Sequence, residues 1–431
     1  MGLEKNIPED WIETTLEENI SVIAMGPFGS NLKRDMFTKE GVPIIKGGNL
    51  SGMYVGGDFT FVSEEKATSL RKAVAYPNDI IITHRGTIGQ VSLVPQNKYK
   101  RYVTSQSQLR FSPDPQKLDY KYILYFLRSR VGQYELLKSS SQVGVPAIAT
   151  PTKSIKEINL FLSSLQEQKA IAKVLTAFDD KIELLQAQNK TLETMAQTIF
   201  KEWFGKYQIG DELHEGWRVT NINEFIESSI GGDYGKETTE EDYTEETICL
   251  RGTDLPDMKT GTPEKAPIRF LKASKLERCK VENGDIVVEI SGGTENQSTG
   301  RVMYINERIL SSANHPMTCV NFCRIIRPLK LEYSYFLYSL FDYLYTRKVF
   351  FNWENGTTGI KNLNLKALLE DFDLFIPENG DLILDFNKNV KASFNKIQTN
   401  NSQIQSLTKT RDTLLPKLMS GQVRVNNTKN A

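Results

Sequence analysis

An internal duplication constrains the fold of this 431-residue chain more than any local motif does. PEDWIETTLEENI (8–20) matches HEGWRVTNINEFI (214–226), and Trp217 lies 206 positions after Trp11. Four more matches follow in the same order: GVPIIKGGNL (41–50) with ETICLRGTDL (246–255), YPNDIII (76–82) with VENGDIVV (281–288), DYKYILYFL (119–127) with EYSYFLYSL (332–340), and EINLFL (157–162) with DFDLFI (371–376). The offset grows slowly, reaching 214 at Leu374, which predicts duplicated domains that differ by loop insertions.

Each half ends in a long segment with helical periodicity. Residues 166–206 carry apolar side chains at a spacing of three to four, with Asn189 on the same stripe. Residues 382–420 repeat this pattern 215 positions later, with Asn401 and Arg411 on the stripe. At about 1.5 Å per residue, each helix would be roughly 60 Å long.

Two such apolar stripes are too long to be buried inside one small domain, which favours a paired arrangement of the helices as a spacer. The alternative is that each helix covers only the domain that precedes it. The residues predicted to pair the helices are Ile182, Leu185, Leu192, Ile199, Ile397, Ile404, Leu407 and Leu414.

The remainder of each half is typical of mixed β structure with a few helices. Residues 76–95 predict a strand, a glycine-containing turn and a second strand, whereas 119–137 have helical spacing. The predicted fold class is α+β, with two similar mixed α/β domains separated by two long helices that form a coiled-coil spacer. The predicted boundaries are 1–162 for the first domain, 163–206 for the first helix, 207–380 for the second domain, 381–425 for the second helix and 426–431 for a flexible tail.

Composition indicates a soluble globular protein, with 39% hydrophobic and 25% charged residues. The sequence has no apolar run near the roughly 20 residues that span a bilayer, and its first residues, MGLEKNIPEDW, lack the apolar core of a signal peptide. A cytoplasmic location without membrane contact is expected. The four cysteines, Cys249, Cys279, Cys319 and Cys323, match no zinc-site spacing, so buried free thiols are expected and no metal is predicted.

Enzyme signatures are missing from the sequence. It has no GxxxxGK[ST] phosphate loop and no glycine-rich cofactor loop followed by an Asn-Pro-Pro-Tyr type tetrapeptide. Asp285 and Glu289 approach the carboxylate pair of a nuclease, but Ile-Ser follows Glu289 where x-Lys is required, and the first half has Thr83 in place of the second carboxylate. We therefore predict no catalytic residue.

Ten short segments at matching points of the two halves combine glycine with polar side chains. Those in the first half are 26–34, 44–50, 83–89, 104–108 and 139–148, and those in the second are 231–237, 250–255, 289–301, 311–318 and 354–363. Glycine permits close backbone approach, and Arg, Lys, Asn and Gln make base-edge and phosphate contacts in DNA readout. Any one such segment is more often just a turn, but the ten together favour a binding face. The aromatic runs near Tyr122 and Tyr335 have helical spacing, which favours core packing over base stacking.

The pattern resembles the specificity subunits of type I restriction–modification systems over nearly the whole chain. The resemblance rests on GPFGSNLKR, GVPIIKGGNL and NDIIITHRGTIG, on the helical segment 165–204, and in the second half on GGDYGKE, LRGTDL, GDIVVEISGGTENQSTGR, VNFCRIIRP and RDTLLPKLMSGQVRV. The helical segment and the RDTLLPKLMSGQ ending are the most specific. One departure is Ser163-Ser164, where the family usually has prolines.

The resemblance implies a non-catalytic protein in which each domain reads one half of a split, asymmetric DNA target. The helices would dock two modification (adenine-methyltransferase) subunits, which use S-adenosylmethionine, and a restriction subunit would add ATP- and Mg-dependent translocation and cleavage. No cofactor is expected on this chain itself. The chain has zero net charge, which fits DNA binding better if those partners supply much of the phosphate contact.

The side chains predicted to contact DNA lie in the glycine-rich segments. They are Lys33, Lys46, Asn49, Arg85, Gln106 and Gln142 in the first half, and Lys236, Arg251, Asp254, Ser291, Asn296, Arg301 and Lys361 in the second. Two alternatives stay open: a coiled-coil scaffold with two duplicated ligand-binding domains, and the specificity component of a related restriction or phage-exclusion system.

Overall fold

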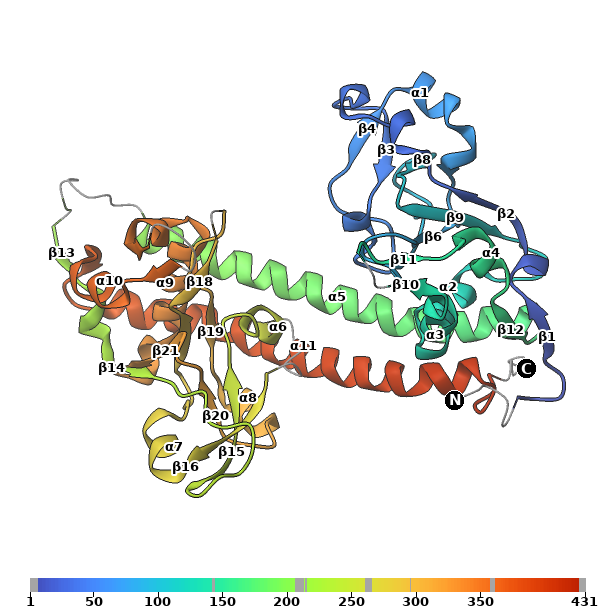
Figure 1. Ribbon diagram of the computed structural model, residues 1–431. Helices are drawn as coiled ribbons and strands as arrows, with labels where there is room; N and C mark the ends of the chain where they lie inside the picture. Colours follow the sequence, from blue (N-terminus) through green and yellow to red (C-terminus); the bar gives the residue numbers. More distant parts are fainter. Residues whose placement is uncertain are drawn as a thin grey trace, which may run out of the picture. The chain divides into compact units, whose positions relative to one another are not determined.

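The structure is a computed structural model that divides into two compact units (Figure 1). It describes residues 7–141, 144–205, 213, 215–259, 266–294, 296–356 and 361–425. Unit 1 comprises Met1–Asp180 and Thr408–Ala431, and unit 2 comprises Lys181–Leu407. Each unit therefore contains one duplicated domain and one stretch of each long helix.

Unit 1 is built on two four-stranded sheets. Its strands are β1 (Ile12–Thr15), β2 (Ile20–Met25), β3 (Val42–Ile45), β4 (Thr60–Val62), β5 (Val74–Ala75), β6 (Ile80–Thr83), β7 (Val91–Leu93), β8 (Tyr102–Thr104), β9 (Gln108–Pro113), β10 (Ser140–Ser141), β11 (Ala147–Ile148) and β12 (Asn159–Leu162). Its short helices are α1 (Glu64–Ser69), α2 (Tyr120–Arg128), α3 (Arg130–Leu137) and α4 (Pro151–Lys156). One sheet has the order β2-β9-β6-β7 and the other the order β4-β3-β8-β5; β1 pairs with β12, and β10 pairs with β11.

Unit 2 repeats much of this arrangement. Its strands are β13 (Trp217–Thr220), β14 (Ile226–Gly231), β15 (Tyr243–Leu250), β16 (Ile268–Lys272), β17 (Ile286–Glu289), β18 (Ser291–Gly293), β19 (Val302–Tyr304), β20 (Met317–Cys319), β21 (Cys323–Pro328), β22 (Glu354–Asn355), β23 (Lys361–Leu363) and β24 (Leu374–Pro377). Its short helices are α6 (Leu255–Lys259), α7 (Ala273–Cys279), α8 (Glu307–Ser312), α9 (Ser334–Thr346) and α10 (Leu365–Asp371). Its sheets have the orders β14-β21-β17-β19, β16-β15-β20, β13-β24 and β18-β23-β22.

The strand orders of the two units correspond one to one over the shared core. The sheet β2-β9-β6-β7 is equivalent to β14-β21-β17-β19, and β4-β3-β8 is equivalent to β16-β15-β20. A parallel strand pairing also recurs, between β3 and β8 in unit 1 and between β15 and β20 in unit 2. The central strands β6 and β17 are runs of Ile and Val that are buried along their whole length, as strands covered on both faces require. The predicted fold class and the duplication are confirmed.

The two long helices are α5 (Leu165–Phe204) and α11 (Asp381–Met419), and both lie inside the ranges predicted for them. Helix α5 begins directly after the serine pair that replaces the family's prolines. The Ser164 hydroxyl accepts a hydrogen bond of 3.2 Å from the backbone N–H of Glu167, so Ser164 is an N-cap three residues before a glutamate. A serine cap therefore starts this helix without proline.

Within unit 2 the helices pack antiparallel, since Ile182 and Leu185 contact Ile404 whereas Phe200, farther along α5, contacts Phe386. Leu407 lies at the edge of the first cluster, and Leu192, Ile199 and Ile397 join the main core of the unit. Leu414 lies in unit 1, against the core of that unit. Every residue predicted to pair the helices thus packs on an apolar cluster.

The asparagines predicted on the stripes meet inside this helix pair. Asn189 donates a hydrogen bond of 2.7 Å to Asn401 Oδ1, and Asn400 donates one of 2.8 Å to Asn189 Oδ1. Asn400 is fully buried. Because a buried amide is satisfied only when its partner stands opposite, these bonds favour one register of the two helices over slipped ones.

The aromatic runs belong to the two cores. Tyr122, Tyr125 and Phe126 on α2 are buried in unit 1, and Tyr335 and the neighbouring aromatic residues of α9 are buried in unit 2. This confirms core packing as the role of these residues. The segment 119–137, predicted from its helical spacing, forms two helices, α2 and α3, because Ser129 is extended (φ −69°, ψ 162°) and caps α3.

Candidate nucleic-acid interface

The glycine-rich loops of unit 1 gather at one edge of its sheets. Strands β3 and β8 are parallel and end together, and a backbone hydrogen bond of 2.9 Å joins Ser105 N to Ile45 O just beyond them. Strands β2 and β6 end beside the start of β9, where His84 N donates to Ser107 O at 3.0 Å. Loops that are far apart in the sequence therefore form one continuous surface.

Unit 2 forms the same edge with the same backbone hydrogen bonds. Val320 N donates to Leu250 O at 2.9 Å, and Ile290 N donates to Phe322 O at 2.8 Å. These four residues stand at the positions equivalent to Ser105, Ile45, His84 and Ser107. The duplicated halves thus present equivalent loops on an equivalent frame.

A glycine directly after β2 and another after β14 make this frame possible. A Cβ atom on Gly26 would lie 1.8 Å from Ser105 O, and one on Gly232 would lie 1.7 Å from Cys319 O. No side chain fits at such distances. The two glycines stand 206 positions apart and let the first loop of each unit press against the loop that precedes β9 or β21.

The loop after β3 and the loop after β15 are held by one side chain each. Asn49 accepts a 2.9 Å hydrogen bond from Lys46 N and donates to Gly56 O and Asp58 O, both at 2.9 Å. Asp254 likewise accepts from Arg251 N at 2.9 Å. Asn49 and Asp254 are buried, so the structure gives both predicted contact residues a role inside their loops.

The cations of these loops also have partners within the chain. Lys46 Nζ donates to Thr60 Oγ1 at 2.7 Å and lies 4.9 Å from the centroid of the Phe37 ring. Arg251 donates from Nε and Nη2 to the two carboxylate oxygens of Asp254, at 2.9 and 2.8 Å, and these bonds raise the pKa of Arg251. Such bidentate bonds hold a guanidinium in a fixed orientation.

The polar side chains where the central strands β6 and β17 end differ between the units. In unit 1, Thr83 donates to Gln90 Oε1 at 3.0 Å beside Gln108. In unit 2 the positions of Thr83 and Gln90 are taken by Glu289 and Arg301. Arg301 Nε donates to Glu289 Oε2 at 2.8 Å and Nη2 donates to Glu289 Oε1, which raises the pKa of Arg301. One unit thus places a neutral hydroxyl and a neutral amide where the other places an ion pair.

Ion pairs account for Asp285 and Glu289, the two carboxylates that approach a nuclease motif. Glu289 binds Arg301, and Asp285 binds Arg327 with a 2.9 Å bond from Nη2. Each carboxylate serves a separate ion pair. Among the residues that the structure describes, no group of three histidine, cysteine or acidic side chains is placed to hold a metal ion.

The remaining predicted contact residues lie on loops or on the small sheet of unit 2. Lys33, Arg85, Gln106, Lys236 and Asn296 are exposed. Ser291 and Lys361 lie on the paired strands β18 and β23, where Lys361 forms a 3.3 Å ion pair with Glu354. Gln142 lies outside the described residues. Contact with DNA stays a prediction for all of these side chains.

Sequence reasoning missed Gln90 altogether, and it did not single out Gln108 and His84, which lie inside two of the predicted segments, or recognise Glu289 as the partner of Arg301. His84 Nε2 lies 3.1 Å from Gln106 O. Burial, and secondarily the charge of Arg85, lower the pKa of His84. The signal that could have found them is strand register, because each stands where a strand of the duplicated frame begins or ends.

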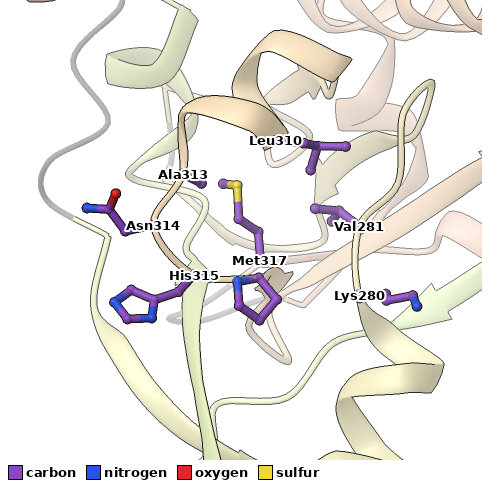
Figure 2. Close-up of a pocket in the computed structure, with 8 residues that line it drawn as sticks. Lys280, Val281, Leu310, Ala313, Asn314, His315 and Met317 are labelled. Carbon is purple, nitrogen blue, oxygen red and sulfur yellow. The ribbon is translucent and has the colours of Figure 1, made fainter.

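A hollow of about 300 Å³ lies elsewhere in unit 2, between α8 and the start of β20. Figure 2 shows Met317 among Leu310, Ala313 and Val281, with Asn314 and His315 on the segment that joins α8 to β20. The glycine-rich loops of the candidate interface lie at the other end of β20, where Cys319 contacts Gly232. This hollow is therefore separate from the candidate interface.

All four cysteines are buried free thiols, as predicted. Burial raises the pKa of Cys249 and Cys319 to about 12. Within the ranges that the structure describes, no helix is both long and apolar enough to cross a membrane.

Comparisons with known proteins show which family this chain resembles. Residues 8–194 match the model of the type I restriction modification DNA specificity domain. A specificity subunit of the type I restriction enzyme MjaIX of Methanocaldococcus jannaschii is 24% identical over 97% of this chain and 95% of its own length. The chain is thus similar to type I restriction–modification specificity subunits, by the family model over its first half and by this relative over nearly its whole length.

Further relatives carry the same description. The HindI specificity subunit of Haemophilus influenzae is 21% identical over 77% of this chain and 83% of its own length. A crystal structure of a type I restriction-modification S subunit from M. genitalium covers 97% of this chain and 98% of its own, with a TM-score of 0.57 at 19% identity. That likeness confirms the fold.

Proposed function

We propose that the chain is a type I restriction–modification specificity subunit, which has no catalytic activity and selects a bipartite, asymmetric DNA target. The recognition domain of unit 1 reads one half-site and that of unit 2 reads the other. The observation that carries the proposal is the sheet edge that the two units share. Equivalent backbone hydrogen bonds hold this edge in both units, but the polar side chains on it differ. Because the side chains differ, the half-sites differ, and the target is not a palindrome.

The amides and the guanidinium at these edges suit different bases. An asparagine or glutamine amide pairs with the N6 and N7 edge of adenine, whereas arginine pairs with O6 and N7 of guanine. Arg251 and Arg301 are each oriented by a carboxylate, which fixes the direction of their remaining N–H donors. In unit 1 the equivalent surface carries Lys46, Arg85 and Gln106.

The partners follow from the division of labour in such systems. Two adenine-methyltransferase subunits dock on the paired helices α5 and α11, and restriction subunits supply translocation and cleavage. S-adenosylmethionine, ATP and Mg act in those subunits. The chain carries zero net charge, so the modification subunits contribute much of the phosphate contact. The complex acts in the cytoplasm on double-stranded DNA.

Mapping methylated adenines across a genome tests the two-domain partition. Arg251→Ala or Arg301→Ala is expected to change recognition at one half-site only, at a cost of about 1–3 kcal/mol in binding if the side chain reads a base edge. Lys46→Ala or Arg85→Ala is expected to affect only the other half-site. A single substitution that relaxes both half-sites equally would contradict the partition. Affinity that does not fall with salt would favour the scaffold alternative.

The helices act as the ruler that sets the distance between half-sites. Insertion of four residues into each helix, after Asp180 in α5 and after Leu407 in α11, adds about 6 Å to each, which is comparable to two base pairs. Both insertions avoid the buried asparagines, so the register of the pair is kept. We expect the same half-sites with one or two more unspecified base pairs between them. An unchanged spacing with full activity would leave only the docking role.

A further inference from the structure

Two large aromatic side chains project from the candidate interface at equivalent positions of the two units. Phe28 is 77% exposed and Tyr234 is 41% exposed. They lie 206 positions apart, each inside a Gly-x-aromatic-Gly sequence, GPFG (26–29) and GDYG (232–235). The residue between the first glycine and the ring differs, Pro27 in one unit and Asp233 in the other. The aromatic ring is therefore kept where its neighbours vary.

The local geometry in unit 1 fixes where Phe28 emerges. Gly26 is pressed against Ser105 O, and a Cβ atom on Gly29 would lie 2.7 Å from Gln106 Oε1. Both ends of the tetrapeptide are therefore fixed on the loop that precedes β9. Phe28 itself is extended (φ −57°, ψ 147°), and its ring is left largely in water beside the exposed Gln106.

In unit 2 the equivalent ring is partly held by the chain. Gly232 is pressed against Cys319 O, and a Cβ atom on Gly235 would lie 2.6 Å from Phe270 O. The guanidinium of Arg269 lies 4.8 Å from the centroid of the Tyr234 ring and donates a 2.9 Å hydrogen bond to its hydroxyl. Tyr234 is thus oriented before any ligand arrives, whereas Phe28 has freedom to move.

An exposed phenyl ring at a polar binding surface is unfavourable in water and becomes favourable once it is covered. Proteins that distort duplex DNA insert such rings between base pairs, which partly unstacks a step and exposes a base for chemistry. Phe322, 59% exposed on a neighbouring loop, has Ser107 as its counterpart and so lacks this duplication. An aromatic ring kept at both units, whose other polar side chains differ, favours a contact that ignores base identity.

We propose that Phe28 and Tyr234 are the wedge residues of the two recognition domains. Each ring packs into one base-pair step of duplex DNA and opens it, independently of sequence. This inference rests on the proposed function, because it requires that the two sheet edges face DNA. It adds a contact that distorts the duplex to the polar contacts that read its bases.

The test uses the full chain co-expressed with its modification subunits and 40-base-pair duplexes that carry the sequence methylated in cells. A series of duplexes places one 2-aminopurine at each position, because its fluorescence rises when its base is unstacked. The variants are Phe28→Ala, Phe28→Trp, Tyr234→Ala and Tyr234→Phe. Tyr134→Ala, which removes a ring that is 66% exposed on α3, is the matched control.

With the wild-type chain we expect one fluorescent step in each half-site. Phe28→Ala should abolish the signal in the half-site of unit 1 alone and weaken affinity roughly 10- to 100-fold, as the loss of one stacked aromatic contact does. Tyr234→Ala should act on the other half-site, with a smaller loss of roughly 3- to 10-fold because Arg269 already covers part of that ring. Phe28→Trp, Tyr234→Phe and Tyr134→Ala should keep both signals.

The salt dependence separates this inference from the proposed function. Removal of a neutral ring releases no counterion, so the slope of affinity against salt should be the same in every variant. Phe28→Ala and Tyr234→Ala chains that bind within about twofold of wild type with unchanged fluorescence overturn the wedge but leave DNA recognition intact. A wild-type complex that does not prefer its methylated sequence overturns the proposed function itself.

Discussion

Units 1 and 2 build the same sheet around a buried aspartate but pair it with arginines at different places. Asp79 accepts from Tyr76 N at 2.9 Å, and Asp285 accepts from Glu282 N at 2.7 Å. In unit 1 the arginine is Arg110, whereas in unit 2 it is Arg327, two positions farther along the equivalent strand. Both units have the aspartate because its carboxylate closes the turn before the strand. The position of the arginine along the partner strand differs between the units.

The same contrast holds at the candidate interface. The glycines and the backbone hydrogen bonds are equivalent, whereas Thr83 and Gln90 correspond to Glu289 and Arg301. A frame held by backbone atoms tolerates different side chains, so the two copies diverged in what they present without changing the sheet. The comparison of the two units therefore separates residues that hold the frame from residues free to read DNA.

The buried ion pairs should give the largest difference between the units. Asp79→Ala leaves Arg110, whose side chain is 8% exposed, without its carboxylate, and should lower the free energy of unfolding of unit 1 by about 3–5 kcal/mol. Asp285→Ala should cost unit 2 less, because Arg327 is 21% exposed and keeps Glu282 at 3.3 Å. Urea unfolding followed by amide hydrogen exchange in each unit measures both effects.

Removal of an exposed carboxylate supplies the control for this pair of variants. Asp242→Ala, which breaks a 3.2 Å ion pair with Lys272 on the surface, should leave stability nearly unchanged, because solvent screens both charges. Equal losses for Asp79→Ala and Asp285→Ala would show that the place of the arginine does not matter.

The Glu289–Arg301 pair offers a direct test of the divergent positions. Arg301→Gln should cost about 2–3 kcal/mol, somewhat less than a fully buried pair, because it strands Glu289 while Arg301 is itself 19% exposed. The double variant Glu289→Thr, Arg301→Gln installs the unit 1 residues and should recover most of that loss. In cells it should alter one half-site only. A double variant as unstable as the single one would mean that the two frames are not interchangeable at this point.

The glycines that hold the first loop should behave alike in both units. Gly26→Ala and Gly232→Ala force a Cβ atom into a backbone carbonyl, and each should cost about 1–3 kcal/mol as the loop shifts. Gly48→Ala is the control, because a Cβ atom there meets nothing within 4 Å. Thermal unfolding compares the three variants. If Gly232→Ala left thermal unfolding unchanged, the two frames would not be equivalent at this glycine.

The smallest expected effect is a pH dependence confined to unit 1, where His84 stands at the position of Ile290 in unit 2. Burial lowers the pKa of His84 in the folded state, so its stabilising contribution is complete above the unfolded-state value near 6.5 and is lost as pH falls from there through the folded-state pKa. The loss should not exceed about 1.4 kcal/mol per pH unit. Amide exchange at pH 7.5 and pH 5.5 should show it in unit 1, and His84→Gln should remove it.

The sequence by itself determined the duplication, the two long helices and the composition of the strands. The duplication shows as five collinear matches between the two halves, and the elements follow from local patterns: Ile and Val runs form most of the buried strands β6 and β17, and a spacing of three to four forms α5 and α11. Glycine-rich segments marked the loops of the candidate interface, because local composition is likewise visible in a single sequence.

Only the tertiary structure decided what individual polar side chains do. Asn49 and Asp254, predicted to contact DNA, are buried and hold their own loops, and Arg301 binds a glutamate 12 residues away in the sequence. The sequence motif around Phe28 and Tyr234 gave no sign that both rings are exposed. Burial and pairing depend on which loops meet where strands end, and those meetings join residues such as Ile45 and Ser105 that no local pattern connects.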